Sequence, residues 1–239
     1  VKPNLILTVP LILEKIYKKM ILPQLSKTTM KVALNIPLLD SRIYAQIRKK
    51  LVDAFGGRFR EVIVGGAAMN EEVTNFLYKI KFPFTIGYGM TECGPLISYD
   101  HNDEYVPGSC GQILKGIMKV RIDSEDPYNK VGEIQVSGEN VMKGYYKNEE
   151  ATSKVFTEDG WLRTGDLGTI DADNRIYIRG RSKTMILGAS GQNIYPEEIE
   201  SKLNNLPFVM ESIIIEKNGK LVGLVYPDYD TVDLSLIHI

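Results

Sequence analysis

Hydrophobic residues recur at helical spacing near the start of the chain. In the segment VPLILEKIYKKMI, Val9, Leu13, Ile16 and Met20 are three or four positions apart, and lysines lie between them. Residues with this spacing share one face of an α-helix. The pattern predicts a helix that buries these four side chains and exposes the lysines.

A longer helix is predicted in DSRIYAQIRKKLVDAFGG. Its apolar positions, Ile43, Ile47 and Leu51, recur every four residues. Asp40 or Ser41 is a suitable cap for its first turn, and the paired glycines at its end are typical of a helix terminus.

Short apolar runs that end in glycine follow. The first run, EVIV, leads into the loop GGAAMN. The segment NEEVTNFLYKI then predicts a helix that Asn70 caps and that has two glutamates in its first turn. The second run, FPFTI, leads into the loop GYGMTECG. A strand, a helix and a strand joined by short links are typical of parallel α/β structure. Ligands collect at the carboxyl ends of such strands, where we expect the two glycine loops, side by side if the strands are neighbours.

The pattern changes from about Gly108 onward. MKVRID, GEIQVSG and GTIDADNRIYIRG alternate apolar and polar residues between turns, which predicts an antiparallel β-rich lobe. After Arg181 come a short strand TMIL, the loop GASGQN and a helix in YPEEIESKLNNL that begins near Pro196. The segment ESIIIEKNGKLVGLVYP predicts a hairpin that turns on Asn218 and Gly219.

These elements predict an α/β fold with three parts. Residues 1–107 would form a parallel α/β layer, residues 108–180 the β-rich lobe, and residues 181–233 the start of a small α+β domain. The tail LSLIHI, Leu234 to Ile239, does not continue the preceding pattern and matches a translated sequencing adapter, so we expect it to be non-native; a natural edge strand is the alternative. We expect the natural chain to extend beyond both ends.

Composition excludes several classes of protein. Hydrophobic residues make up 44% of the chain and charged residues 25%, as in ordinary globular proteins, and the net charge of −1 disfavours a nucleic-acid partner. With two cysteines, Cys93 and Cys110, in no CxxC motif, a disulfide scaffold or structural zinc site is disfavoured, and a reducing, cytoplasmic compartment is expected. The chain has only two histidines, His101 and His238, which disfavours a histidine-based catalytic triad.

The loop GYGMTE carries side chains suited to a nucleotide. Gly87 and Gly89 permit close approach of a flat ligand and a positive φ, and Tyr88 offers a face on which a purine can stack. Thr91 can donate to a phosphate oxygen, and Glu92 is a hard oxygen ligand suited to Mg²⁺. Taken alone, the loop is equally typical of a plain turn with a solvated glutamate.

Three segments in order carry a family resemblance. GYGMTE, GWLRTGDLG and GRSKTMILGASGQNIYPEEIE resemble the adenylate-forming (AMP-binding) superfamily, which includes the acyl-CoA synthetases. The resemblance extends from the first helix to about Asp233. VPLILEKIYKK is similar to the branch that comprises the long-chain fatty acid–CoA ligases.

The resemblance implies roles for individual residues. It assigns Thr91 to the phosphate and Glu92 to the metal, and Gly65, Gly66, Ala67 and Ala68 to the wall of the adenine pocket, where small side chains admit a purine. A tight strand-to-helix turn is the alternative for this GGAA segment.

Further roles implied by the resemblance fall later in the chain. Asp166, which TGD would place in a turn, accepts hydrogen bonds from the ribose hydroxyls, and Arg181 is directed at the ribose and phosphate. Lys183 lies near the pivot of the small domain, and the loop with Gly188 and Gly191 lines the route of the pantetheine arm. A turn aspartate, a solvated arginine and a plain connection are the corresponding alternatives.

The resemblance therefore predicts an ATP-dependent ligase that uses Mg²⁺, converts a fatty acid to acyl-AMP and transfers it to coenzyme A. The family's phosphate-cradling loop and its C-terminal lysine are absent from this sequence, so we expect the 239-residue chain itself to have little ligase activity. Alternatives are a ligase for another acid, a peptide-synthetase adenylation domain, a non-catalytic nucleotide-binding module, or a structural fragment with motif-like turns. The partners would be small molecules, with peripheral membrane contact through upstream segments as a further expectation; no sequence feature assigns an oligomeric state.

Overall fold

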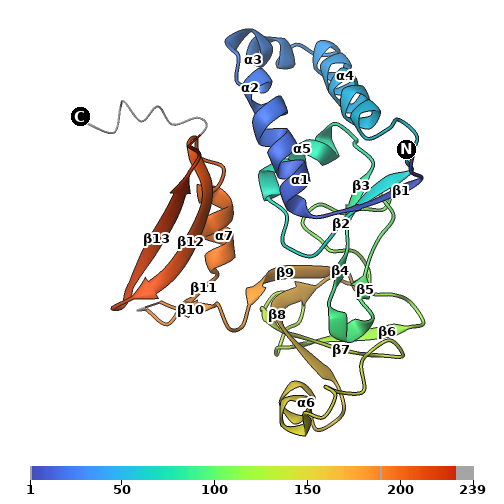
Figure 1. The fold of residues 1–239 in the computed structure, drawn as a ribbon, viewed down its shortest axis with the longest axis vertical. Coiled ribbons are helices and arrows are strands. Elements are labelled where there is room, and N and C mark those ends of the chain that lie inside the picture. Colours follow the sequence, from blue (N-terminus) through green and yellow to red (C-terminus); the bar gives the residue numbers. More distant parts are fainter. Residues whose placement is uncertain (1, 189, 230–239) are drawn as a thin grey trace. The chain divides into compact units, whose positions relative to one another are not determined.

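The computed structural model of the chain describes residues 2–188 and 190–229 (Figure 1). The tail Leu234 to Ile239, predicted to be non-native, lies outside the described residues. The chain divides into two compact units. The first comprises residues 1–120, 137–149 and 171–177, and the second comprises residues 121–136, 150–170 and 178–239.

A parallel sheet organises the first unit. Its three strands are β1 (Leu5–Thr8), β2 (Glu61–Val64) and β3 (Phe84–Ile86), in the order β1-β2-β3. Both pairs are parallel, with Ile6 opposite Val62 and Val62 opposite Phe84. The prediction of parallel α/β structure is confirmed, although β1 was not foreseen.

Helix α5 (Glu71–Lys79) connects β2 to β3. The side-chain oxygen of Asn70 accepts hydrogen bonds from the amides of Glu72 and Val73, at 2.9 and 3.3 Å. These bonds satisfy two amides that have no partner within the helix. Asn70 is therefore the cap that the sequence predicted.

The face that the N-terminal helical segment buries agrees only in part with the prediction. Leu13 is buried and Ile16 packs, partly buried, against the core, as predicted. Val9 and Met20, however, are 50% and 59% exposed, and Tyr17 and Ile21 are buried instead. A π-helical turn in the middle of the segment shifts the phase of the following residues, so a regular 3.6-residue period fails there. The segment consists of α1 (Pro10–Ile16), the π-turn η1 (Tyr17–Ile21) and α2 (Leu22–Leu25).

Two more helices follow, α3 (Thr28–Leu34) and α4 (Leu39–Ala54). The start of α4 differs from the prediction, because its N-cap is Leu38, with φ of 71°, and neither Asp40 nor Ser41 caps it. At the other end, the predicted glycine terminus is confirmed, since Gly56 and the glycine after it both have positive φ. Among the described residues, no helix is long and apolar enough to cross a membrane.

The hydrophobic core of the first unit lies between the parallel sheet and its helices. Phe55, Phe59 and Phe82 pack edge-on or tilted against one another at centroid distances of 5.9 to 6.1 Å, an arrangement that aromatic rings favour. Buried residues that the strands and helices contribute to this core include Val62, Val64, Phe84, Leu13, Tyr17, Ile21, Val73, Phe76 and Leu77.

The predicted β-rich region is also confirmed. A four-stranded sheet has the order β6-β7-β8-β9, and β7 pairs antiparallel with β8. Its strands are β6 (Met118–Asp123), β7 (Gly132–Gly138), β8 (Leu162–Ile170) and β9 (Ile176–Arg181), and the short helix α6 (Glu149–Val155) precedes β8.

The C-terminal elements of the second unit match the prediction closely. The hairpin of β12 (Val209–Lys217) and β13 (Lys220–Pro227) turns on Asn218 and Gly219, whose φ values of 55° and 73° fit a two-residue turn. It is preceded by β10 (Ile186–Leu187), β11 (Asn193–Ile194) and α7 (Pro196–Leu203).

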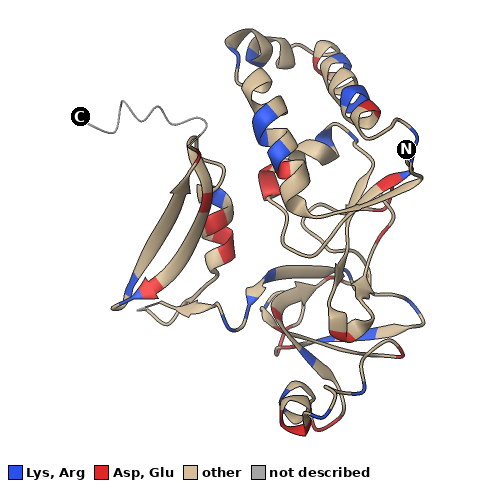
Figure 2. Ribbon diagram, in the orientation of Figure 1, with Lys and Arg blue, Asp and Glu red and all other residues tan. Residues whose placement is uncertain are grey.

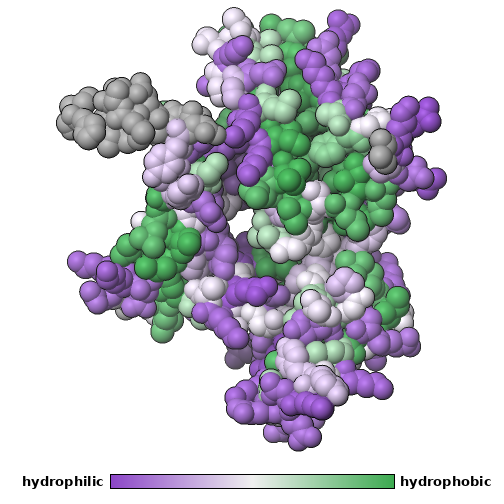
Figure 3. Space-filling model, viewed as in Figure 1, coloured by the Kyte–Doolittle hydropathy of each residue, from purple (hydrophilic) through white to green (hydrophobic). Residues whose placement is uncertain are grey.

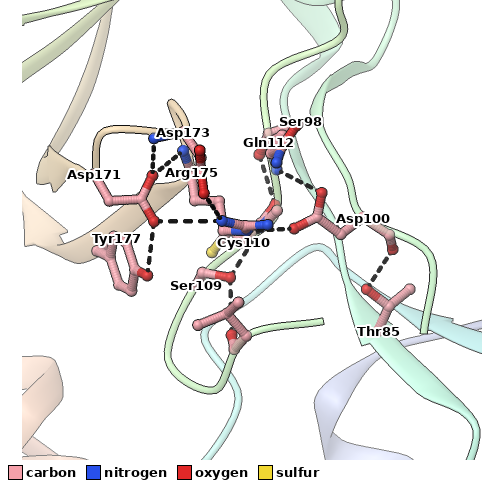
Figure 4. A network of polar contacts seen from close by, with 12 residues as sticks. Thr85, Ser98, Asp100, Ser109, Cys110, Gln112, Asp171, Asp173, Arg175 and Tyr177 are labelled. Carbon is pink, nitrogen blue, oxygen red and sulfur yellow. Dashed lines mark hydrogen bonds and ion pairs between the residues drawn. The ribbon is translucent and has the colours of Figure 1, made fainter. Parts of the chain in front are cut away.

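A buried polar network in the first unit centres on Asp100 (Figure 4). The Asp100 carboxylate, whose side chain is 3% exposed, accepts hydrogen bonds from Nε of Arg175 at 3.0 Å and from the amide of Gln112 at 3.1 Å. Its backbone carbonyl accepts the hydroxyl of Thr85, in β3, at 2.7 Å. Arg175 also donates to Asp173, at 2.7 Å. The network fastens β3 to two distant segments.

Two aspartates that bind the same arginine should differ in their effect on stability. Asp100→Ala leaves Nε of the largely buried Arg175 and the amide of Gln112 without an acceptor, so we expect the free energy of unfolding to fall by about 3 kcal/mol. Asp173→Ala is the matched control: the Asp173 side chain is 67% exposed, so we expect a loss below about 1 kcal/mol. Urea denaturation measures both, and equal losses would show that burial of Asp100 is not what matters.

Candidate functional site

Two glycine loops lie side by side at the carboxyl edge of the parallel sheet. The amide of Gly65 donates to the carbonyl of Thr8, and the amide of Gly87 donates to that of Val64, at 3.1 and 2.9 Å. A Cβ atom on Gly65 would lie 3.4 Å from the carbonyl oxygen of Gly87. The expectation that the two loops are neighbours is therefore confirmed.

The first loop presents small residues to solvent. Gly66 has φ of 87°, and Gly66, Ala67 and Ala68 are all exposed. Without large side chains, this edge leaves the backbone open to a flat ligand. The assignment of these residues to an adenine pocket stays a prediction.

The second loop is shaped by Gly89. Residues Tyr88–Gly89 form strand β4, which pairs antiparallel with β5 (Leu96–Ser98). A Cβ atom on Gly89 would lie 2.0 Å from the carbonyl oxygen of Pro95, so only glycine fits. The predicted positive φ is wrong, because neither Gly87 nor Gly89 is among the glycines with positive φ; Gly89 is needed for space.

Tyr88 is more enclosed than an open stacking platform would be. Only 7% of this residue is exposed, so protein atoms cover most of the ring. Stacking of a purine on Tyr88 stays a prediction, and it would require the ligand to use the remaining exposed part of the ring.

The short 3₁₀ turn η2 (Thr91–Cys93) holds the candidate phosphate and metal residues. Thr91 is exposed and Glu92 is half-buried, whereas Cys93 is fully buried. Burial, together with the neighbouring Glu92 carboxylate, raises the pKa of the Cys93 thiol to about 11. Cys93 therefore anchors the turn as an apolar residue, and Thr91 and Glu92 face outward from it.

A segment between β7 and α6 supports this turn, and the sequence analysis did not foresee it. The amide of Met142 donates to the backbone carbonyl of Glu92 at 2.7 Å, and the Asn140 side chain donates to the carbonyl of Cys93 at 2.6 Å. The Tyr145 hydroxyl donates to the Glu92 carboxylate at 2.9 Å, and this hydrogen bond raises the pKa of Tyr145. The segment has no regular secondary structure, so no hydrophobic period could have identified it.

In the second unit, the structure brings Asp166 and Arg181 together. Nε of Arg181 lies 3.3 Å from Oδ1 of Asp166. The Asp166 side chain is 10% exposed and that of Arg181 is 74% exposed, so a fixed carboxylate holds one end of a guanidinium that is otherwise in solvent. The predicted turn is wrong, because Asp166 lies within β8, directly after Gly165 with its φ of 74°. The pair presents an acceptor and a fork of donors together, as a sugar phosphate would require.

The remaining candidates lie close behind Arg181 in the chain. Lys183 is exposed in the turn that follows β9. Gly188 and Gly191 belong to the connection between β10 and β11, where the amide of Gly188 donates to the carbonyl of Gln192 at 2.8 Å. Gly191 has φ of 80°, and a Cβ atom there would meet no neighbouring atom, so glycine is favoured at this position by the backbone conformation and not by lack of space. The roles of these residues as pivot and pantetheine contact stay predictions.

Comparison with known proteins tests the family resemblance against the alternative of a structural fragment with motif-like turns. The family described as AMP-binding enzyme matches residues 1–146, which include both glycine loops and Tyr145. The chain belongs to the AMP-binding enzyme family. This confirms the resemblance inferred from GYGMTE and the two later segments.

Curated members of this family that resemble the chain are CoA ligases. Long-chain-fatty-acid–CoA ligase 1 of Saccharomyces cerevisiae is 28% identical over an alignment of 247 positions, which covers 95% of the chain. 4-Coumarate–CoA ligase 1 of Glycine max is 34% identical over 173 residues, which cover 67% of the chain. The chain spans 35% of the length of the yeast relative and 58% of that of the soybean relative.

Solved structures of the family agree with the fold. ATP-bound MatB from Rhodopseudomonas palustris superposes with a TM-score of 0.69 and 29% identity, covering 96% of this chain and 42% of MatB. MenE from Bacillus subtilis, in complex with ATP and a magnesium ion, gives a TM-score of 0.69 and 26% identity, covering 94% of this chain and 42% of MenE. The α/β fold with parallel and antiparallel sheets is that of adenylate-forming enzymes.

The two glycines that flank Tyr88 should respond differently to a methyl group. Gly89→Ala would force a backbone shift against Pro95, so we expect a loss of about 2 kcal/mol in the free energy of unfolding. In Gly87→Ala, the new Cβ would lie 3.5 Å from Leu96 Cδ1, an ordinary contact, so we expect wild-type stability. Urea denaturation measures both; a destabilised Gly87→Ala together with a neutral Gly89→Ala would contradict the packing described above.

Proposed function

We propose that this chain is part of an ATP-dependent acyl-CoA ligase, which joins a long-chain fatty acid to AMP and transfers the acyl group to coenzyme A. The observation that carries the proposal is the outward-facing pair Thr91 and Glu92, held at the carboxyl edge of a parallel sheet in a chain of the AMP-binding enzyme family. The CoA ligases among its relatives supply the reaction class.

Glu92 is suited to magnesium. Mg²⁺ prefers oxygen ligands and is commonly held by one or two carboxylates together with substrate phosphates. Among the described residues, no cluster of three or more His, Cys, Asp or Glu could hold a metal by itself, which agrees with a site completed by ATP. Bound there, Mg²⁺ would offset the negative charge of the phosphates. Tyr145, hydrogen-bonded to Glu92, would fix the orientation of the carboxylate.

The chain's other candidates would bind and orient the nucleotide. The Thr91 hydroxyl would donate to a phosphate oxygen, and the small residues of the first loop would admit adenine beside Tyr88. Asp166 would accept hydrogen bonds from the ribose hydroxyls, while Arg181 would direct its free donors to the ribose and phosphate. Holding two anions in reacting geometry is the main contribution that such residues make. Gly188 and Gly191 would leave room for the thin pantetheine arm.

A long-chain acid is the favoured substrate because a relative that covers 95% of this chain is a long-chain ligase. An aromatic acid is the second candidate, since the soybean 4-coumarate ligase is more similar per residue, at 34% identity. Release of pyrophosphate by the complete protein, supplied in turn with palmitate and 4-coumarate in the presence of ATP, Mg²⁺ and coenzyme A, distinguishes the two.

Glu92→Gln should reduce turnover in that assay on the order of a hundredfold, because an amide replaces the charged ligand of the metal. The matched control is Glu104→Gln, which changes an exposed glutamate of the same unit and should leave turnover unchanged. ATP should still raise the melting temperature of the Glu92→Gln protein, since the adenine and ribose contacts remain.

Unchanged turnover in Glu92→Gln would refute the metal role. An absence of acid-dependent pyrophosphate release, with ATP stabilisation retained, would favour a non-catalytic nucleotide-binding module. Failure of ATP to shift the melting temperature of the unmodified protein would refute nucleotide binding altogether.

A further inference from the structure

The charge of the chain is distributed very unevenly. Residues 1–60 contain twelve Lys or Arg and three Asp or Glu, which gives a net charge of +9, although the whole chain carries −1. Figure 2 shows basic residues recurring along the helical segment from α1 to α4 of the first unit, where acidic residues are few. Such an asymmetry points to a negatively charged partner of the helical segment.

The turn between α3 and α4 is unusually apolar for an exposed turn. We define the α3–α4 tip as residues 27–42. Within it, Ile36, Leu38 and Leu39 are 48%, 79% and 38% exposed. Leu38 has φ of 71°, a conformation that leucine rarely adopts, and its backbone carbonyl accepts the Ser41 hydroxyl at 3.0 Å. The backbone therefore holds a large apolar side chain outward into water.

Basic residues flank this apolar turn. Lys27, Lys31 and Arg42 are exposed, and Asp40, half-buried in the first turn of α4, is the acidic residue of the tip. Within the described part of the chain, none of the three basic residues makes an ion pair. Figure 3 shows hydrophobic residues reaching the surface beside hydrophilic ones at this end of the first unit.

We propose that the α3–α4 tip docks on the surface of an anionic lipid bilayer, with Leu38 and its apolar neighbours entering the headgroup region and Lys27, Lys31 and Arg42 contacting the lipid phosphates. A protruding apolar turn with basic residues around it suits this surface, because apolar insertion and attraction to anionic lipids act together in interfacial binding. A nucleic acid would satisfy the charges and not the exposed leucines. The inference stands whichever acid the protein activates.

Vesicle flotation of the protein tests the proposal, with vesicles of phosphatidylcholine alone and of an equal mixture of phosphatidylcholine and phosphatidylserine. We expect binding to the mixed vesicles only, and weaker binding at high salt because salt screens the charges. Lys27→Gln combined with Lys31→Gln should weaken that binding on the order of twentyfold, since each basic residue at an anionic surface contributes about a fivefold factor. The matched control, Lys217→Gln with Lys220→Gln, removes two exposed lysines from the second unit and should bind like the wild type.

Leu38→Asn tests the insertion of the turn. Asparagine tolerates positive φ, so the fold should persist, and binding to mixed vesicles should fall on the order of fivefold with the charges unchanged. Ile36→Asn is the second variant, at a position without backbone strain, and Leu206→Asn, which removes a leucine 49% exposed in the second unit, is the control. Melting temperatures confirm that each variant is folded.

Several results would overturn the proposal. One is equal binding to both kinds of vesicle, and another is an equal loss of vesicle binding in the two double lysine variants. A third is wild-type binding of both Leu38→Asn and Ile36→Asn. The last is tighter binding to duplex DNA than to mixed vesicles at the same salt concentration. Concentration-dependent dimerisation that is abolished by Leu38→Asn, without vesicle binding, would instead assign the tip to contact between two copies of the chain.

Discussion

The ion pair between Asp100 and Arg175 fixes the strand from which the candidate nucleotide loop extends. A buried carboxylate is costly unless its oxygens are paired, and here an arginine and a backbone amide pair them. The same residue holds Thr85 in β3, two positions before Gly87. The loop that carries Glu92 therefore begins at an anchored point. A side chain on an anchored loop, such as Glu92, loses little conformational freedom when it binds a metal ion or a nucleotide.

Local chemistry explains what could be predicted from the sequence. Asn70 caps α5, and Asn218 with Gly219 turns the last hairpin, because each side chain or backbone preference acts within a few residues. The buried face of the first helix could not be predicted in the same way. A π-helical turn at Tyr17 shifts the helical phase, so Met20 is exposed where a regular period would have buried it.

In the candidate site too, only those residues that a sequence motif marks could be predicted. Glu92 and Thr91 could be singled out because their motif is contiguous, and Asp166 with Arg181 because the resemblance linked two distant motifs. Tyr145, which binds Glu92, comes from a segment without a hydrophobic period, and only its position in space reveals it. The net charge was similarly uninformative, because a sum of −1 over the whole chain conceals the basic first quarter of the chain.

The burial of Cys93 has a practical consequence. Its thiol lies directly beside Glu92, and because it is shielded from water and has a pKa near 11, almost none of it is thiolate at neutral pH. An alkylating reagent can reach this sulfur only during moments when the turn comes away from the body of the protein. The rate at which Cys93 is alkylated would therefore report how often the loop opens, and a nucleotide bound to the loop would lower that rate.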